Sequence, residues 1–112
     1  MKIGIPREIK NHEYRVAITP AGVHELVSHG HEVIIETEAG AGSSFSDTDF
    51  KAAGAQIFTS ASEVWDAADL LLKVKEPIAE EYARLRKDQV LFTFLHLAAS
   101  KACTDALLAS GT

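Results

Sequence analysis

Two apolar runs, Leu70–Lys75 and Val90–His96, place the strongest constraint on the fold of this chain. Runs of this kind are typical of strands that are buried on both faces of a parallel sheet. Helix signals lie between them, so we expect right-handed βαβ crossovers and an α/β fold in which helices flank a parallel sheet. The predicted strands are 2–5, 31–36, 55–58, 69–75 and 89–96.

Helix boundaries are marked by residues that satisfy free backbone groups. Thr19-Pro20 predicts the start of a helix over 20–29, and Gly30 can end it in a left-handed conformation. Ser46 to Asp49 and Ser60 to Glu63 have the spacing of capping boxes, so a short helix should follow each. The charge pattern and the apolar spacing predict two more helices, at about 78–87 and 98–108.

The composition excludes several classes of protein. A chain of 112 residues with 46% hydrophobic and 24% charged residues is typical of one globular domain. A net charge of -5 disfavours nucleic acid as a partner. No apolar run has the length of a membrane span or a signal core, so we expect a cytoplasmic protein. One cysteine, Cys103, cannot form an internal disulfide, and no His or Cys spacing indicates a metal site.

Lys75 and His96 each end one of the two apolar runs. In open α/β sheets the ligand crevice lies outside the carboxyl ends of the strands, so both side chains should face it. A lysine in an apolar strand needs an acid, water or a catalytic use, and a histidine can exchange protons near neutral pH. Two alternatives stay open: that Lys75 only covers the core with its stem, and that His96 is a hydrogen-bonded core residue. Alternation places Lys73 on the face of Lys75, and we interpret Lys73 as structural or solvent-reaching.

Arg15 lies between the first strand and the first helix, in a segment that faces the same crevice. Its guanidinium could bind a carboxylate through two parallel hydrogen bonds. The alternatives are an exposed arginine or an ion pair with Glu8 or Glu13. The glycines in 38–44 follow a strand, but no full helix starts beside them, so we interpret them as a structural turn and not as a dinucleotide-binding loop.

Several motifs in order resemble one family. They resemble the amino-terminal region of alanine dehydrogenases and of the alpha subunit of proton-translocating nicotinamide nucleotide transhydrogenases, and they cover nearly the whole chain. Lys75 and His96 favour alanine dehydrogenase, because the transhydrogenase subunit is without this lysine. Saccharopine dehydrogenases are more distant relatives that also use a Lys and His pair. The motifs are Gly4–Glu8, Arg15–Val23, Leu72–Pro77 and Phe94–Ser100.

The resemblance implies the reversible oxidative deamination of L-alanine by NAD to pyruvate and ammonium. It implies that Arg15 and Lys75 bind the carboxylate and carbonyl end of pyruvate, that Lys75 polarises the carbonyl oxygen, and that His96 donates and accepts the proton. It also implies that residues 1–112 are the amino-terminal part of a Rossmann-like or flavodoxin-like substrate domain, in a protein that forms homo-oligomers, usually hexamers or dimers. The NAD-binding domain and a further catalytic aspartate would lie outside this chain, which we therefore expect to be inactive alone.

Two other functions stay open at this point. The chain could be the corresponding domain of a transhydrogenase subunit, which couples conformational change to a proton channel. It could also be a free-standing receiver-like module, although that class needs acids after the first strand, where this chain has Pro6-Arg7. Residues beyond Thr112 would separate these possibilities.

Overall fold

A computed structural model describes all residues from 1 to 112, and it confirms the predicted α/β class. The strands are β1 (Lys2–Ile5), β2 (Glu32–Glu36), β3 (Gln56–Phe58), β4 (Leu70–Lys75) and β5 (Val90–Phe94). The helices are α1 (Pro20–Ser28), α2 (Asp47–Ala53), α3 (Ala61–Ala67), α4 (Ala79–Tyr82) and α5 (Lys101–Ser110). Two 3-10 turns, η1 (Ala41–Ser43) and η2 (Leu97–Ala99), complete the order.

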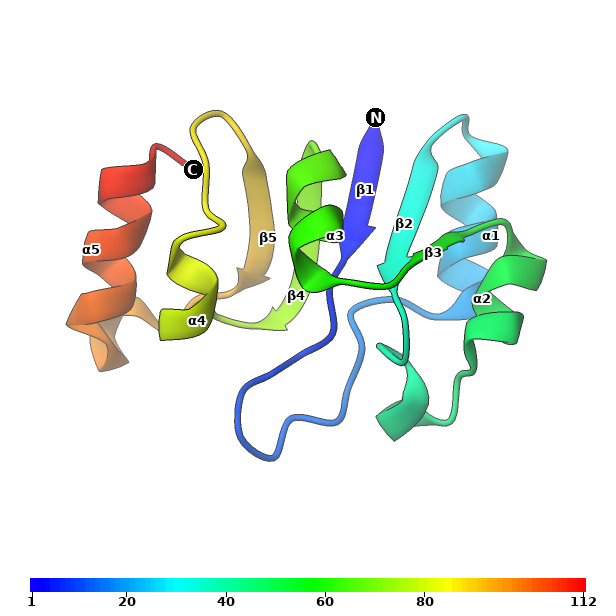
Figure 1. Ribbon diagram of the computed structural model, residues 1–112, viewed down its shortest axis with the longest axis horizontal. Coiled ribbons are helices and arrows are strands. Elements are labelled where there is room, and N and C mark those ends of the chain that lie inside the picture. The colour runs from blue at the N-terminus through cyan, green and yellow to red at the C-terminus, as the bar shows by residue number, and fades with distance from the viewer.

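The five strands form one parallel sheet in the order β3-β2-β1-β4-β5. Their carboxyl ends share the lower edge in Figure 1. This is the Rossmann strand order and not the flavodoxin order, and its direction reverses between β1 and β4. A ligand crevice is expected at that reversal, where the long loop 6–19 leaves β1 (Figure 1).

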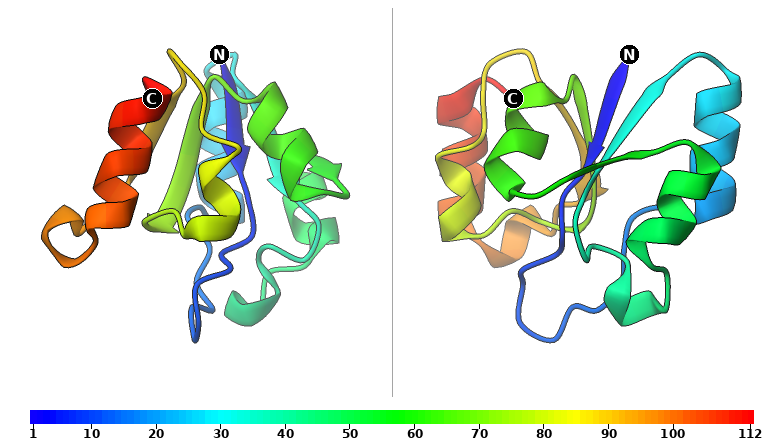
Figure 2. Two further views of the ribbon diagram at one scale, coloured as in Figure 1. Left: turned by 60° about the vertical axis from the view of Figure 1, so that its left-hand side comes forward. Right: turned by 45° about the vertical axis from the view of Figure 1, so that its right-hand side comes forward.

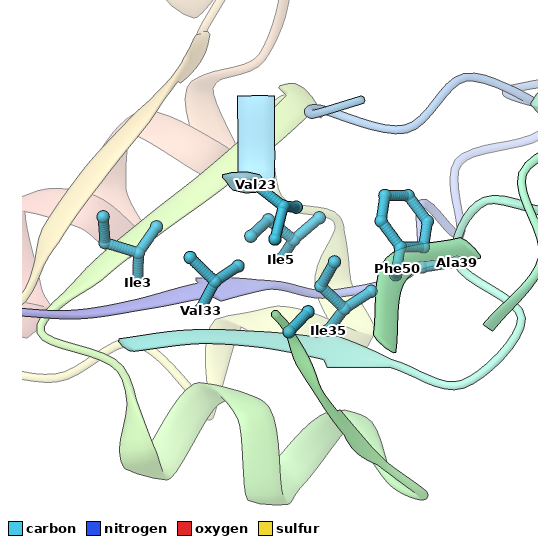
Figure 3. Packing of buried hydrophobic residues seen from close by; sticks show 8 residues of the cluster. Ile3, Ile5, Val23, Val33, Ile35, Ala39 and Phe50 are labelled. Atoms are coloured by element: carbon cyan, nitrogen blue, oxygen red, sulfur yellow. The ribbon is translucent and has the colours of Figure 1, made fainter. Parts of the chain in front are cut away.

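Helices cover both faces of the sheet. The right-hand view of Figure 2 separates α1 and α2 on one side from α3, α4 and α5 on the other. The first side encloses a core in which Ile5, Val23, Ile35 and Phe50 are fully buried (Figure 3). A second core lies under α3, around the fully buried Trp65. No helix combines the length and the apolar character needed to cross a membrane.

Most of the predicted helix boundaries are confirmed. The Thr19 side chain caps α1, and Gly30 has the expected positive φ of 87° after it. Ser46 and Asp49 form a complete capping box at α2, while Ser60 caps α3. The last helix starts later than predicted, because Ser100 caps α5 and leaves 97–99 as a separate 3-10 turn.

The helix predicted over 78–87 is confirmed only in its first turn, since α4 covers Ala79–Tyr82 and ends there. Two side chains hold the following segment in an irregular path across the end of α3. Gln89 donates hydrogen bonds to the carbonyls of Trp65 and Ala68, and Arg86 donates to Ala68 as well. These carbonyls would otherwise be left free at the helix end. The long-range bonds therefore outweigh the local helix signals.

The expectation that both apolar runs are buried on two faces is wrong for the second. On β5 the side chains of Phe92 and Phe94 are 72% and 73% exposed, because no helix covers that face. The strand also ends at Phe94, so His96 lies beyond it. In addition, the pairing of β4 with β5 shifts by one residue between Leu72 and Lys75. This shift interrupts the alternation that was expected to place Lys73 and Lys75 on one face.

Candidate active site

The candidate residues all lie at the carboxyl edge of the sheet. Arg15 is on the loop after β1, Lys75 is the last residue of β4, and His96 follows β5. These three segments emerge at the lower edge in Figure 1, beside the reversal in strand order. The topology therefore brings together residues that are far apart in the sequence.

Lys75 and Lys73 have different surroundings. The ammonium of Lys73 is buried and lies 3.2 Å from both Glu8 and Glu81, so its charge is already paired. Lys75 is half-buried, and its ammonium has no hydrogen bond or ion pair within the chain. Lys73 is thus structural, as interpreted from the sequence, and Lys75 is the lysine free to meet a ligand.

Arg15 is oriented by Glu13. The guanidinium donates from Nε to Glu13 Oε2 at 2.9 Å and from Nη2 to Oε1 at 2.7 Å, and the backbone N–H of Arg15 donates to the same carboxylate. The side-chain hydrogen bond from Arg15 is the main reason that the pKa of Glu13 falls from 4.5 to about 2. Arg15 is 64% exposed, and Nη1 bonds nothing in the chain. A guanidinium has five N–H donors, so its outer edge stays free for a second carboxylate.

His96 is held at the edge of the sheet in a rare backbone conformation. Its φ of 49° is left-handed, which is uncommon for a residue other than glycine and clusters at functional sites. The imidazole is 61% exposed, so His96 is not the buried core residue of the alternative interpretation. Its Nδ1 lies 4.0 Å from the Oε2 atom of Glu76. This leaves the other ring nitrogen free to face a substrate.

Glu76 connects this region to the loop after β1. Its Oε1 atom bonds the ammonium of Lys10, while its Oε2 atom is buried without a hydrogen bond and faces His96. Burial is the largest single influence on this carboxyl group and opposes its charge, but the hydrogen bond from Lys10, a backbone hydrogen bond and the charges of Lys10 and Lys75 together outweigh it, so the pKa of Glu76 is lowered.

The charge of Lys75 reaches both neighbouring carboxylates. It contributes to the lowered pKa of Glu13, which binds Arg15, and to that of Glu76, which faces His96. Lys75 therefore lies within electrostatic range of the partners of both other candidates. The arrangement suits a small anionic ligand, because it offers two cations and one group that exchanges protons.

Two hollows meet at Arg15. One, of about 470 Å³, lies between the loop 6–19 and the 38–42 turn, and it also contains Glu8 and Glu13. The other, of about 580 Å³, extends over the uncovered face of β4 and β5 to Phe92 and Phe94. Neither hollow is lined by Lys75 or His96. Arg15 is thus accessible from two sides.

The glycines at 40 and 42 serve packing, as predicted. A Cβ atom on Gly42 would lie 2.5 Å from the carbonyl oxygen of Tyr14, so the loop 6–19 already fills the space beside this glycine. The Ser43 hydroxyl also donates to that carbonyl. The turn therefore supports the loop that carries Arg15.

Sequence reasoning located only part of the acidic partners of these cations. The alternative of an ion pair between Arg15 and Glu13 is confirmed, whereas Glu8 lies on Lys73 and not on Arg15. No role was predicted for Glu76, which faces His96, or for Glu81, which pairs with the structural Lys73. A signal existed for Glu8 and Glu76, because each lies within three residues of the carboxyl end of a parallel strand.

Comparison with known proteins identifies one family and several relatives that this chain resembles. The family described as "Alanine dehydrogenase/PNT, N-terminal domain" matches residues 4–112. The alanine dehydrogenase of Mycolicibacterium smegmatis is 71% identical over 112 residues, which are the whole of this chain and 30% of that protein. An alanine dehydrogenase of Mycobacterium tuberculosis is 70% identical over the same length. The chain thus spans about 30% of the length of these relatives.

Solved structures give the same result. An L-alanine dehydrogenase structure matches 98% of this chain and 30% of its own, with a TM-score of 0.95 and 49% identity. A transhydrogenase structure from Sinorhizobium meliloti matches 99% of this chain and 32% of its own, with a TM-score of 0.91 and 30% identity. Both the fold and the sequence therefore agree with the family match. The chain belongs to the family of alanine dehydrogenase/PNT amino-terminal domains.

Proposed function

We propose that residues 1–112 form the amino-terminal part of the substrate-binding domain of an alanine dehydrogenase. The proposed reaction is the reversible oxidation of L-alanine by NAD to pyruvate and ammonium. The observation that carries this proposal is the unpaired ammonium of Lys75, which ends β4 at the same edge of the sheet as an oriented Arg15 and an exposed His96. Identity of 71% to an alanine dehydrogenase, against 30% to the transhydrogenase, favours this activity.

Arg15 binds the substrate carboxylate in this proposal. Its Nε and Nη2 atoms are held by Glu13, so the guanidinium is oriented before the ligand arrives. The Nη1 side can then donate to a second carboxylate in the fixed geometry of the fork. Such preorganisation reduces the entropy lost on binding.

Lys75 and His96 act at the reacting end of the same small molecule. The ammonium of Lys75 stabilises negative charge that develops on the carbonyl oxygen of pyruvate, an effect commonly worth about 3–4 kcal/mol for one donor. His96 accepts and returns the proton, and the Oε2 atom of Glu76 lies 4.0 Å from its Nδ1. NAD supplies the hydride acceptor. We also propose that the enzyme works in the cytoplasm as a homo-oligomer.

The test is a kinetic comparison in the full-length protein that contains this chain. The wild type should reduce NAD when L-alanine is added, as followed by NADH absorbance. Lys75→Ala should lower turnover by about 10²–10³-fold, and His96→Ala by about 10²–10⁴-fold, with unchanged circular dichroism. His24→Ala and Lys87→Ala are matched controls, because both residues are exposed and Lys87 precedes the amino end of β5, at the opposite edge of the sheet, and they should retain activity. A wild type without alanine-dependent NAD reduction would overturn the proposal.

A further inference from the structure

Beneath Lys75 lies a buried group of three charged side chains. The ammonium of Lys73 lies 3.2 Å from Glu8 Oε1 and 3.2 Å from Glu81 Oε2, and the three side chains are only 1–2% exposed. Burial raises the pKa of Glu81, although Lys73 opposes this shift. Buried charges cost several kcal/mol each, so such a group needs a reason beyond stability.

Glu8 differs from Glu81 in what else it binds. Its Oε2 atom accepts the backbone N–H of Val74 at 3.1 Å, and its Oε1 atom accepts the backbone N–H of Lys75 at 3.0 Å. These peptide groups lie within the one-residue shift in register between β4 and β5. Glu81 bonds only Lys73 and the N–H of Ile78, at the start of its own helix.

A shift in register leaves the bulged backbone in need of other partners. The carboxylate of Glu8 supplies them, and it does so for the residue whose ammonium the proposed reaction uses. Lys73 binds Glu8 from the interior side, which fixes the carboxylate in position. The direction of the Lys75 side chain thus depends on a carboxylate in a different segment of the chain.

We propose that Glu8 is a positioning residue for Lys75. This inference rests on the proposed function and deepens it, because it explains how the fold orients the cation at the substrate oxygen. Glu8 touches no reacting atom in this scheme, and it acts only through the backbone of Val74 and Lys75. A displacement of about 1 Å in a catalytic group can cost about 10²-fold in rate, so the effect should be visible in kinetics.

Glu8→Gln is the informative variant. Both oxygens of Glu8 accept a backbone N–H, so an amide in their place keeps one acceptor and turns a donor toward the other N–H. Lys73 and Glu81 would remain as an ion pair with no net charge, so this variant should still fold. In the full-length enzyme kcat/KM for pyruvate should fall by about 10–100-fold, while KM for NADH changes by less than about twofold.

Glu81→Gln is the matched control. It also removes one buried carboxylate from Lys73 and leaves a neutral pair, but Glu81 does not contact the backbone of β4. A purely structural role predicts that both variants lower the melting temperature and leave kcat/KM per folded molecule unchanged. A positioning role predicts that the loss of kcat/KM is confined to Glu8→Gln. Equal kinetic effects of the two variants would overturn the inference.

A second readout does not depend on activity. Reductive methylation with ¹³C labels lysine amines, and the NMR signal of Lys75, assigned with Lys75→Arg, reports the surroundings of its ammonium. That signal should move in Glu8→Gln and stay in Glu81→Gln. If Glu8→Gln fails to fold, Glu8→Asp keeps the charge for Lys73 while it shortens the reach to Val74 and Lys75, and it should move the signal too. An unmoved signal would overturn the inference, whereas an inactive wild type would overturn only the proposed function.

Discussion

The two halves of the sheet use their apolar residues differently. In the half made by β1, β2 and β3, helices cover both faces, and Ile5, Ile35 and Phe50 are fully buried (Figure 3). In the half made by β4 and β5, helices cover only one face, and Phe92 and Phe94 on the other face are largely exposed. Exposed apolar faces of this kind are typical of contact surfaces.

This difference shows what each half contributes. The first half is stabilised by apolar packing, and its strand β1 anchors the start of the loop 6–19. The second half places Lys75 and His96 at its edge and depends on buried polar contacts, in particular those of Lys73 and Gln89. The candidate active site thus lies where the packed half meets the half with an uncovered face.

The largest expected effect breaks the polar support of the second half. Lys73→Met would leave the carboxylates of Glu8 and Glu81 buried without their cation. The free energy of unfolding should therefore fall by about 3–5 kcal/mol, and the loss should lie near the upper end of this range. Urea unfolding of the 112-residue chain measures this change. Lys101→Met is the control, because its pair with Asp105 is exposed and should contribute under about 1 kcal/mol. Equal losses in the two variants would show that Lys73 is not a buried ion pair in solution.

The second prediction compares one phenylalanine from each half. Phe50→Ala removes a fully buried ring, so the free energy of unfolding should fall by about 3–4 kcal/mol. The loss comes from the hydrophobic burial of the ring and from the cavity that remains. Phe92→Ala removes a ring that is 72% exposed and should change stability by less than about 1 kcal/mol in the same chain. Urea unfolding curves of the two variants measure both changes in stability. A loss for Phe92→Ala as large as that for Phe50→Ala would mean that the open face is covered in solution.

Sequence patterns predicted the first half better than the second for a physical reason. Apolar spacing and capping residues act locally, so they located α1, α2 and the strands around them. The end of α4 depends instead on bonds from Gln89 and Arg86 to carbonyls about 20 residues away in the sequence. No local pattern contains such contacts.

The same distinction holds for the candidate site. The positions of Lys75 and His96 at the carboxyl edge of the sheet followed from the sequence, since the carboxyl ends of parallel strands share one edge, although β5 ends at Phe94, before His96. The sequence already favoured Lys75 over Lys73, but it did not identify the buried partner of Lys73, because Glu8 lies 65 residues before it. The register shift that separates these lysines is likewise set by tertiary contacts. Residue roles were therefore harder to predict than residue locations.

A smaller effect is expected at the contact between the loop 6–19 and the 38–44 turn. Gly42→Ala places a Cβ atom 2.5 Å from the carbonyl oxygen of Tyr14, so the loop must shift. This shift should lower the free energy of unfolding by about 1–3 kcal/mol. Because Arg15 follows Tyr14, KM for pyruvate in the full-length enzyme should rise more than kcat falls. Ala41→Ser, at an exposed neighbouring position, should leave both constants unchanged. An unchanged KM in Gly42→Ala would mean that the turn does not position Arg15.

The smallest effect concerns the pH dependence of Glu13. Its pKa in the fold, about 2, lies below the ordinary 4.5, so the folded state binds the proton more weakly than the unfolded state. The stabilisation is therefore complete above pH 4.5 and is lost as the pH falls through about 2. NMR titration of the Glu13 carboxyl carbon should give this low midpoint, and Arg15→Met should return it toward 4.5. If the midpoint stays low in Arg15→Met, another cation holds Glu13, and Arg15 is not oriented by this carboxylate before it meets a substrate.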